Sequence, residues 1–288
     1  MTLDPRLPTP PRRAVPAGSC DTHAHVYAEP YPVDNASYVI PRAHPDVYRG
    51  MLATTGMTYG VVVQPDAYRD TRLLEQVLAE GVGRLAGVAV VDERVTPEHL
   101  ERLHTLGVRG LRFNLQTDRR TGQRYAGSAG ADALRQLAPR LGELGWHAQL
   151  WGPLDECLRL AADTERHAVP VVLDHMGWPD VAAGTGGAGF QRLLRTLDQG
   201  NLWVKLSVCR FGAPEGGYPG IRPFHDALVG ARPDRLLWGS DWPYVGMGDA
   251  APDVGELLDL FQDWVADDKT VAQILVANPA RLYGLPEC

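Results

Sequence analysis

Eight short runs of apolar and β-branched residues recur along the chain, separated by polar or amphipathic segments. They span residues 18–27, 59–65, 85–91, 108–115, 146–152, 168–176, 201–208 and 234–243. Several are continuously apolar rather than alternating, which is typical of parallel strands that are covered on both faces. The pattern therefore predicts eight strands of this buried kind.

Segments with the apolar spacing of amphipathic helices follow the second to the eighth run. They span residues 70–81, 96–107, 131–145, 153–167, 189–200, 222–231, 254–265 and 268–284. The second of them begins with Thr96 as an expected N-cap and Pro97 at the first helical position. The first run is followed instead by residues 28–48, which we expect to form a long loop over the mouth of the fold.

Strands that alternate with helices in a chain of 288 residues favour a closed α/β barrel, a (β/α)8 TIM barrel, as a single domain. The competing open, doubly wound sheet should carry a glycine-rich phosphate turn after its first strand. Here the first strand ends in His-Ala-His. We therefore expect one barrel domain over residues 18–288, preceded by an extended, proline-rich arm over residues 1–17.

Composition narrows the class of protein. A formal net charge of −7 argues against a nucleic-acid surface and against attraction to anionic membranes. The sequence has no apolar run long enough to span a membrane and no signal-peptide pattern, and its four cysteines are scattered without a CxxC pair. We expect a cytoplasmic protein with reduced thiols, whose Trp- and Pro-rich surface loops permit a homo-oligomer.

Polar residues gather at the ends of the predicted strands. They are His23, His25, Gln64, Asp66, Arg112, Asn114, Gln149, Asp174, His175, Lys205, Ser207, Arg210, Ser240 and Asp241. In a (β/α)8 barrel the carboxyl ends of the strands converge on one mouth, where active sites lie. Core packing alone does not explain such clustering, so the sequence predicts a site at the mouth.

The individual signals differ in strength. The pair His23 and His25 could be metal ligands, a metal-free acid–base pair, or ordinary core histidines. Asp241 lies within the apolar run "LLWGSDWP", where an unpaired carboxylate would be costly. His175 lies in a similar setting. Because these four residues come from the first, sixth and eighth strands, they can meet across the barrel, and the combination favours an active site.

Four motifs carry a family resemblance. "CDTHAHVY", "LDHMGWPD", "WGSDWPY" and "NPARLYG", in this order, resemble the amidohydrolase superfamily. The likeness is greatest to the amidohydrolase 2 type, in the branch of 2-pyrone-4,6-dicarboxylate lactonase-like enzymes and sugar-acid lactonases. It covers the chain from about residue 18 to its end and implies an amidohydrolase-like barrel.

The resemblance implies metal ligands at the HxH of the first strand and at the aspartate of the eighth, but two positions depart from that pattern. The fourth strand offers Arg112 and Asn114, without the lysine or glutamate of binuclear members. The fifth carries Gln149 in the usual ligand position, while His147 would lie deeper in the barrel. Both departures agree with the lactonase branch and favour a site without a cofactor. The alternative is a divalent metal such as zinc, held by His23, His25 and Asp241, with His175 as a further ligand.

The resemblance further implies hydrolysis of a carboxylate-bearing lactone. Asp241 is the expected general base for the attacking water, positioned by His23 and His25. His175 is expected to polarise the lactone carbonyl, with the histidines of the first strand as an alternative. Asp174, next to His175 in a strand, is expected on the opposite face.

Arginine suits bidentate capture of a substrate carboxylate, so Arg112 is the leading binding residue and Arg210 the second. Trp178 stands where the resemblance implies an arginine. This favours a substrate with fewer carboxylates, or a sugar-derived one that stacks on the indole. Further expected binding residues are Gln64, Asn114, Gln149, Ser207 and Tyr38.

Three other functions remain open at this stage. One is a sugar-acid lactone isomerase that uses a similar site. Another is a zinc-dependent decarboxylase or hydratase of the same superfamily. The last is a barrel kept for binding rather than catalysis, which the set of His23, His25, His175 and Asp241 disfavours.

Overall fold

Eight parallel strands form one sheet whose order follows the sequence, β1 to β8. The computed structural model describes residues 4–33, 38–68, 70–117, 122–125, 127–212 and 217–286. The strands are β1 (Cys20–Ala24), β2 (Tyr59–Val63), β3 (Leu85–Ala89), β4 (Val108–Asn114), β5 (His147–Trp151), β6 (Val171–Leu173), β7 (Leu202–Lys205) and β8 (Leu236–Leu237). Each lies within one of the eight apolar runs, so the strand prediction is confirmed.

The residues that follow β8 close the sheet against β1. Thr22 donates from its backbone N to the carbonyl of Trp238 over 3.1 Å, and the backbone N of His25 donates to the carbonyl of Trp242 over 2.8 Å. The backbone N of Asp241 donates to the carbonyl of His23 over 2.8 Å. The predicted (β/α)8 barrel is therefore confirmed, and its seam brings the HxH of β1 beside Asp241.

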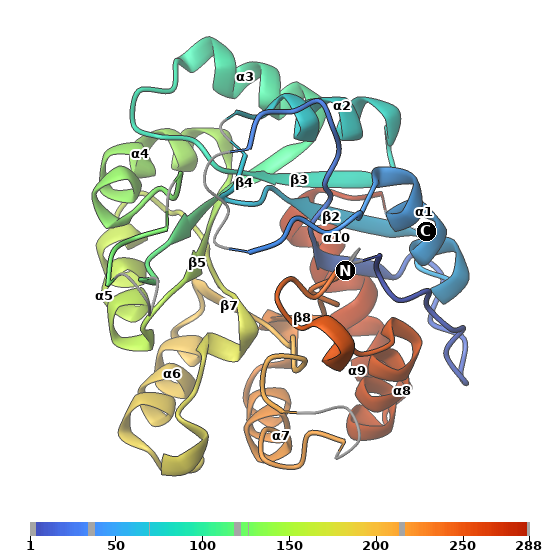
Figure 1. Ribbon diagram of the computed structural model, residues 1–288. Helices are drawn as coiled ribbons and strands as arrows, with labels where there is room; N and C mark the ends of the chain where they lie inside the picture. Colours follow the sequence, from blue (N-terminus) through green and yellow to red (C-terminus); the bar gives the residue numbers. More distant parts are fainter. Residues whose placement is uncertain are drawn as a thin grey trace.

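Helices surround the strands in a ring (Figure 1). They are α1 (Pro45–Thr55), α2 (Arg72–Glu80), α3 (Pro97–Leu106), α4 (Ala131–Leu144), α5 (Leu154–Glu165), α6 (Ala188–Gln199), α7 (Arg222–Ala231) and α8 (Val254–Val265). The last predicted helix divides into α9 (Asp268–Ala272), a π-helical turn (Gln273–Ala277) and α10 (Asn278–Tyr283). The expected loop over residues 28–48 is too long, because α1 begins at Pro45. Its N-cap, His44, accepts a hydrogen bond from the backbone N of Asp46.

The core has two layers, as expected for a barrel whose strands bury both faces. One fills the space between the sheet and the helices and includes Leu111, Leu134 and Leu193. The other fills the barrel interior with residues such as Val61, Val88 and Val172. At the amino-terminal end of the strands, Tyr283 of α10 packs edge-on against His147 with ring centroids 5.2 Å apart. Polar groups gather at the opposite end of the strands, where the cavity opens.

The described part of the amino-terminal arm lies along α8. Thr9 donates from its backbone N to the carboxylate of Asp253 over 3.0 Å, and Arg12 pairs with Asp259 over 3.0 Å. Cys20, Cys157 and Cys209 are buried free thiols, whereas Cys288 lies outside the described residues. Within the described ranges, no helix has the length and apolarity needed to cross a membrane.

Candidate active site

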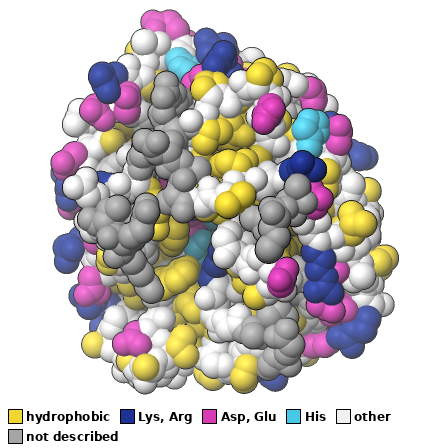
Figure 2. All heavy atoms as spheres, viewed as in Figure 1, with side chains coloured by type: hydrophobic (Ala, Val, Ile, Leu, Met, Phe, Trp, Pro, Cys, Tyr) yellow, Lys and Arg dark blue, Asp and Glu magenta, His cyan; other side chains and the backbone are white. Residues whose placement is uncertain are grey.

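A cavity of about 300 Å³ opens at the carboxyl ends of the strands. Figure 2 shows this face hollowed near its centre, with hydrophobic side chains around the hollow and a histidine visible inside it. The lining residues are His25, Tyr27, Tyr38, Pro65, Asp66, Ala67, Arg112, Asn114, Tyr125, Trp151, His175, Trp178, Arg210, Asp241, Val245 and Gly246. They come from seven of the eight strand ends and from the loop before α1.

Most of the residues predicted for the site meet at this cavity. Eight of them line it: His25, His175, Asp241, Arg112, Arg210, Asn114, Trp178 and Tyr38. His23 lies directly behind the lining and is fully buried. Gln64, Gln149 and Ser207 are also buried but do not line the cavity.

The side-chain amides of Gln64 and Gln149 form hydrogen bonds with other groups of the protein. Gln64 accepts a hydrogen bond from the backbone N of Val90 over 3.0 Å and donates to the carbonyl of Asp70 over 3.2 Å. It therefore ties the end of β2 to the end of β3. Gln149 donates to Asp174 over 3.1 Å and accepts from Lys205 over 2.7 Å, beneath the cavity floor.

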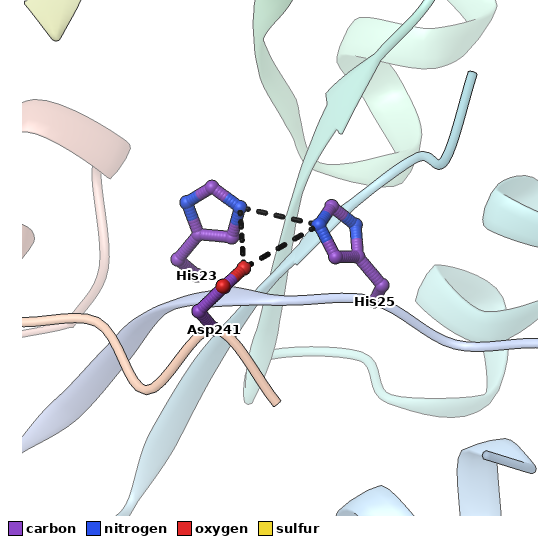
Figure 3. Close-up of side chains that lie close together, drawn as sticks. All are labelled: His23, His25 and Asp241. Carbon is purple, nitrogen blue, oxygen red and sulfur yellow. Dashed lines mark hydrogen bonds and ion pairs between the residues drawn. The ribbon is translucent and has the colours of Figure 1, made fainter. Parts of the chain in front are cut away.

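His23, His25 and Asp241 form a compact cluster, and Figure 3 shows their polar atoms pointing toward one another. The Nε2 atoms of the two histidines lie 3.3 Å apart. Oδ1 of Asp241 lies 3.6 Å from Nε2 of His23 and 3.8 Å from Nε2 of His25. The HxH spacing on a strand aims both rings at the same side, and the β8–β1 seam supplies the carboxylate.

Arg210 holds the other carboxylate oxygen of Asp241. Its Nε donates to Oδ2 over 2.5 Å, and its guanidinium also donates to the carbonyl of Val245 over 2.8 Å. Burial raises the pKa of Asp241, but Arg210 and the histidines outweigh it and hold that pKa well below its usual range. Asp241 is therefore an ionised acceptor throughout the neutral pH range.

The segment after β6 departs from regular strand geometry. His175, Met176 and Trp178 all have a positive φ, of 49°, 57° and 51°, and Asp241 has a φ of 63°. Left-handed backbone is unfavourable for residues other than glycine, and such strain gathers at functional sites. Four such residues lie at this mouth, which makes it the candidate functional end of the barrel.

The expectation that Asp174 faces away from His175 is wrong. Oδ1 of Asp174 lies 3.2 Å from Nδ1 of His23, and the His175 ring centroid lies 5.3 Å from that of His23. The strand ends at Leu173, so the alternation of side chains ends there too, and the left-handed backbone of His175 turns its ring inward. Both side chains consequently face the centre.

Arg112 is a buried cation at the cavity wall. Its Nε lies 3.5 Å from Oδ2 of Asp174 and has no hydrogen-bond partner among the residues that the structure describes. Its guanidinium stacks over Trp151 at 5.3 Å from the ring centroid.

Asn114, the other predicted binding residue of β4, donates to Asp66 over 2.6 Å and accepts from the backbone N of Gln116 over 2.9 Å. Arg112 is therefore the freer of the two to bind a ligand.

Aromatic side chains make up one wall of the cavity. Trp178 contacts Phe211, with centroids 5.2 Å apart, and His175, with centroids 5.8 Å apart. Trp151 stacks on Tyr125 at 6.2 Å and 12°. The lining also carries charged groups, and the guanidinium of Arg112 lies over Trp151, so the cavity can hold a flat ring with an anionic substituent beside it.

Lys205 and Asp174 are polar residues of this site to which the sequence pattern assigned no role in it. Lys205 is fully buried, and its Nζ donates to the carbonyl of Thr22 over 2.8 Å and lies 3.7 Å from Asp174. Burial lowers the pKa of Lys205 to about 8 against the opposing effect of Asp174. A lysine at the end of an apolar strand was the available signal, because such a charge requires buried partners.

The cluster of His23, His25 and Asp241 has the spacing of a metal site. Zinc bonds of about 2.0–2.2 Å in a tetrahedron place ligand atoms roughly 3.3–3.5 Å apart. The distances of 3.3, 3.6 and 3.8 Å are near that spacing. A second group consists of His23, Asp174 and His175, whose ligand atoms lie within 4.8 Å of one another. Residue types and spacing thus match a zinc ion.

Comparison with known proteins gives a consistent picture. The amidohydrolase family model matches residues 20–285. The chain is 32% identical to a 4-sulfomuconolactone hydrolase from Rhizobium radiobacter, over 94% of this chain and 92% of that protein. It is 29% identical to a 2-pyrone-4,6-dicarboxylate hydrolase from Comamonas testosteroni, over 96% and 93%. A D-galactarolactone isomerase from Agrobacterium fabrum is 26% identical, over 96% and 94%.

Solved structures agree on the fold. A crystal structure described as a 2-pyrone-4,6-dicarboxylic acid hydrolase from Pseudomonas putida is 28% identical, has a TM-score of 0.79 and covers 94% of this chain and 99% of its own. An amidohydrolase from Burkholderia multivorans with bound zinc is 22% identical, with a TM-score of 0.71 and coverage of 94% and 100%. The likeness to the Burkholderia multivorans protein concerns the fold alone. It adds that zinc binds to some proteins of this architecture.

Proposed function

Because the chain belongs to the amidohydrolase family, we propose that it is a hydrolase that opens a carboxylate-bearing lactone. The observation that carries the proposal is the cavity in which the ionised Asp241, the neutral His175 and the cationic Arg112 face one space of about 300 Å³. Ester hydrolysis needs a base for water, a donor for the developing oxyanion and a group that holds the substrate. These three residues supply one of each.

Asp241 acts as the general base. Its Oδ1 lies 3.8 Å from Nε2 of His25, which lines the cavity, while Oδ2 is held by Arg210. A water beside Oδ1 loses a proton to the carboxylate as its oxygen bonds to the lactone carbonyl carbon. The ring oxygen then leaves that carbon and takes up a proton, so the product is an open-chain hydroxy acid or its keto tautomer. His23 and His25 keep the carboxylate oriented.

His175 polarises the carbonyl. Its Nδ1 is buried and has no hydrogen-bond partner within the described residues, and the ring lines the cavity. Burial lowers the pKa of His175 to about 4, against the effects of Asp241 and Asp174. The imidazole is therefore neutral near pH 7 and keeps one N–H for the oxyanion.

Arg112 binds the substrate carboxylate, and the aromatic wall of Trp151 and Trp178 binds the ring. Arg210 is already paired with Asp241, which leaves Arg112 as the arginine with donors to spare among the described lining residues. This supports a lactone with one carboxylate near Arg112 and a flat, unsaturated ring. Asn114, Gln64 and Gln149, which a polyhydroxylated sugar ring would need as partners, are instead bonded within the protein.

The reaction proceeds without a metal. Asp174 and Asp241 already lie within 4 Å of the cations Arg112, Arg210 and Lys205. A divalent ion at the cluster would add two positive charges beside three that the protein supplies, in a buried setting where such repulsion is strong. The stabilisation of negative charge that a metal would provide is available from these side chains.

The first test is proton release from a panel of lactones by chelator-treated protein whose metal content has been measured. The panel spans pyrone carboxylates, muconolactones and aldonic or aldaric lactones. We expect turnover without metal, and the preferred lactone carries a carboxylate on an unsaturated ring. Activity that returns only with zinc or manganese would overturn metal independence and identify His23, His25 and Asp241 as metal ligands. A new lactone without proton release would identify an isomerase instead.

A further inference from the structure

The arginine and aspartate side chains that line the cavity balance one another in charge. The arginines are Arg112 and Arg210, and the aspartates are Asp66 and Asp241. Arg210 forms an ion pair with Asp241, so this pair adds no net charge to the cavity. The charge that an anionic ligand meets therefore depends on Arg112 and Asp66.

Asp66 is held in place after the end of β2, but one of its two oxygens has no described partner. Its Oδ2 accepts from Nδ2 of Asn114 over 2.6 Å. Asn114 is fixed in turn, because its Oδ1 accepts from the backbone N of Gln116 over 2.9 Å. Oδ1 of Asp66 is buried and has no hydrogen-bond partner among the described residues. Of the two lining carboxylates, Asp66 is thus the one whose charge the described side chains compensate less.

The negative charge of Asp66 acts on the guanidinium of Arg112. Burial lowers the pKa of Arg112, but the carboxylates around it outweigh burial, and Asp66 contributes more than Asp174 or Asp241. Oδ2 of Asp174 lies 3.5 Å from Nε of Arg112, so the effect of Asp66 exceeds that of a carboxylate in near contact. A ligand carboxylate bound by Arg112 therefore has Asp66 as a neighbour.

This balance limits how many carboxylates a ligand can bring. The first one binds Arg112 and leaves one uncompensated negative charge in the cavity. A second one meets no unpaired cation among the described lining residues, and it is repelled by Asp66. Repulsion between like charges is strong where water is largely excluded, and selectivity between ligands often depends on such repulsion.

We propose that Asp66 is a specificity-determining residue that excludes dicarboxylates and restricts the cavity to ligands with a single carboxylate. The inference rests on the proposed function, which places the substrate carboxylate on Arg112. It narrows the substrate class to lactones with one carboxylate on an unsaturated ring. It also assigns the selection to a repelling charge in the cavity wall.

Two flat anions that cannot be hydrolysed, benzoate and isophthalate, test the proposal because they differ by one carboxylate. Isothermal titration of the unmodified protein gives a dissociation constant for each. We expect benzoate to bind at least as tightly as isophthalate, although isophthalate offers two carboxylates to Arg112. Tighter binding of isophthalate would overturn the proposal.

The substitution Asp66→Asn removes the charge and keeps the shape of the side chain, since the amide oxygen can still accept from Asn114. We expect the affinity for isophthalate relative to benzoate to rise at least about tenfold. This is the order expected for two unit charges about 10 Å apart at an effective dielectric constant of about 20. A general loosening of the cavity would weaken both anions alike. An unchanged ratio of the two affinities would therefore contradict the role given to Asp66.

Asp132→Asn is the matched control. Asp132 lies on α4, its side chain is 91% exposed, and it does not line the cavity. The substitution makes the same change of charge in solvent, so the ratio of the two affinities should stay as in the unmodified protein. An equal rise in this variant would show that the net charge of the molecule makes the selection, and would overturn the proposal.

Binding of the two anions does not depend on catalysis. Failure of the proposed function would appear as absence of lactone turnover, whichever anion binds. Binding of neither anion would overturn the placement of a carboxylate on Arg112, and the inference with it. Where lactones are turned over, Asp66→Asn should raise kcat/KM for a pyrone dicarboxylate relative to a pyrone monocarboxylate. An unchanged or lower ratio would count against Asp66.

Discussion

Asp241 combines an ionised carboxylate with a strained backbone and an arginine that holds one of its two oxygens. Burial alone would favour the neutral acid, but Arg210 and three histidines keep its pKa low. Such a carboxylate is a weak base, so proton transfer from water needs simultaneous stabilisation of the oxyanion. In the proposed mechanism, Asp241 therefore acts only together with the donors around it.

Asp241→Asn is expected to lower kcat by about 10²–10⁴-fold, the range over which general base catalysis contributes. Steady-state kinetics on the preferred lactone give kcat, and equilibrium binding of the lactone or its product gives affinity. The amide keeps the size of the side chain, so affinity should change little. Unchanged turnover would remove Asp241 from the mechanism.

Arg112→Lys is expected to raise KM by about 10- to 100-fold, because a lysine replaces a bidentate guanidinium with a point charge. A neutral lactone, in which the carboxylate is a methyl ester, is the matched control substrate. Its KM should be nearly the same for both proteins. A similar loss on both substrates would mean that Arg112 supports the cavity rather than the carboxylate.

At the scale of elements, N-cap residues determine where helices begin. Two N-caps of this protein, Thr96 and Asp253, differ in the groups that they bind. Thr96 caps α3 by accepting from the backbone N of His99, which confirms its predicted role. Asp253 caps α8 by accepting from Gly255 and Glu256, and it also accepts from Thr9 of the arm. The second cap therefore joins two segments that are distant in sequence.

Thr96→Ala should cost about 1 kcal/mol of the free energy of unfolding, the usual value for a lost N-cap. Asp253→Ala should cost about 2–3 kcal/mol, because it also removes partly buried hydrogen bonds to the arm. Urea unfolding measures both, and limited proteolysis should cut the arm of the second variant faster. Equal costs would show that the arm adds nothing to the stability of α8.

At the scale of the whole molecule, several histidines are buried in neutral form, in the site and outside it. Burial lowers the pKa of His147 to about 3 and that of His225 to about 4. His225 lies far from the cluster, between α7 and α8, with its ring 5.0 Å from that of Trp264. Each such residue must take up a proton on unfolding in mild acid, so the molecule as a whole is acid-labile.

The sign of this effect follows from linkage. Between about pH 6.5 and 4 the unfolded state binds more protons than the folded state, so the free energy of unfolding falls as the pH falls. A shift from an ordinary pKa near 6.5 to about 4 is worth about 3 kcal/mol per histidine at pH 4. Urea unfolding at pH 7 and pH 4 should show His225→Phe losing less stability than the unmodified protein. The same loss in both would contradict neutral burial of His225.

The sequence alone determined the barrel and most of the site. Parallel strands that are buried on both faces read as continuous apolar runs, and their carboxyl ends must converge. Polar residues at those ends, such as His25, Arg112 and Asp241, could therefore be assigned to one mouth without knowledge of any contact. The same reasoning assigned Trp178 and Arg210 to that mouth.

Only the tertiary structure decided which of these polar groups are free. Gln64 and Gln149 lie at strand ends too, but their amides are bonded within the protein. His175 faces the centre beside Asp174 because its left-handed backbone turns its ring inward, and Lys205 reaches Thr22 across 183 positions of sequence. A periodic pattern records which side of a strand a residue occupies. Its partner depends on how the strands are staggered around the barrel, which no local stretch of sequence specifies.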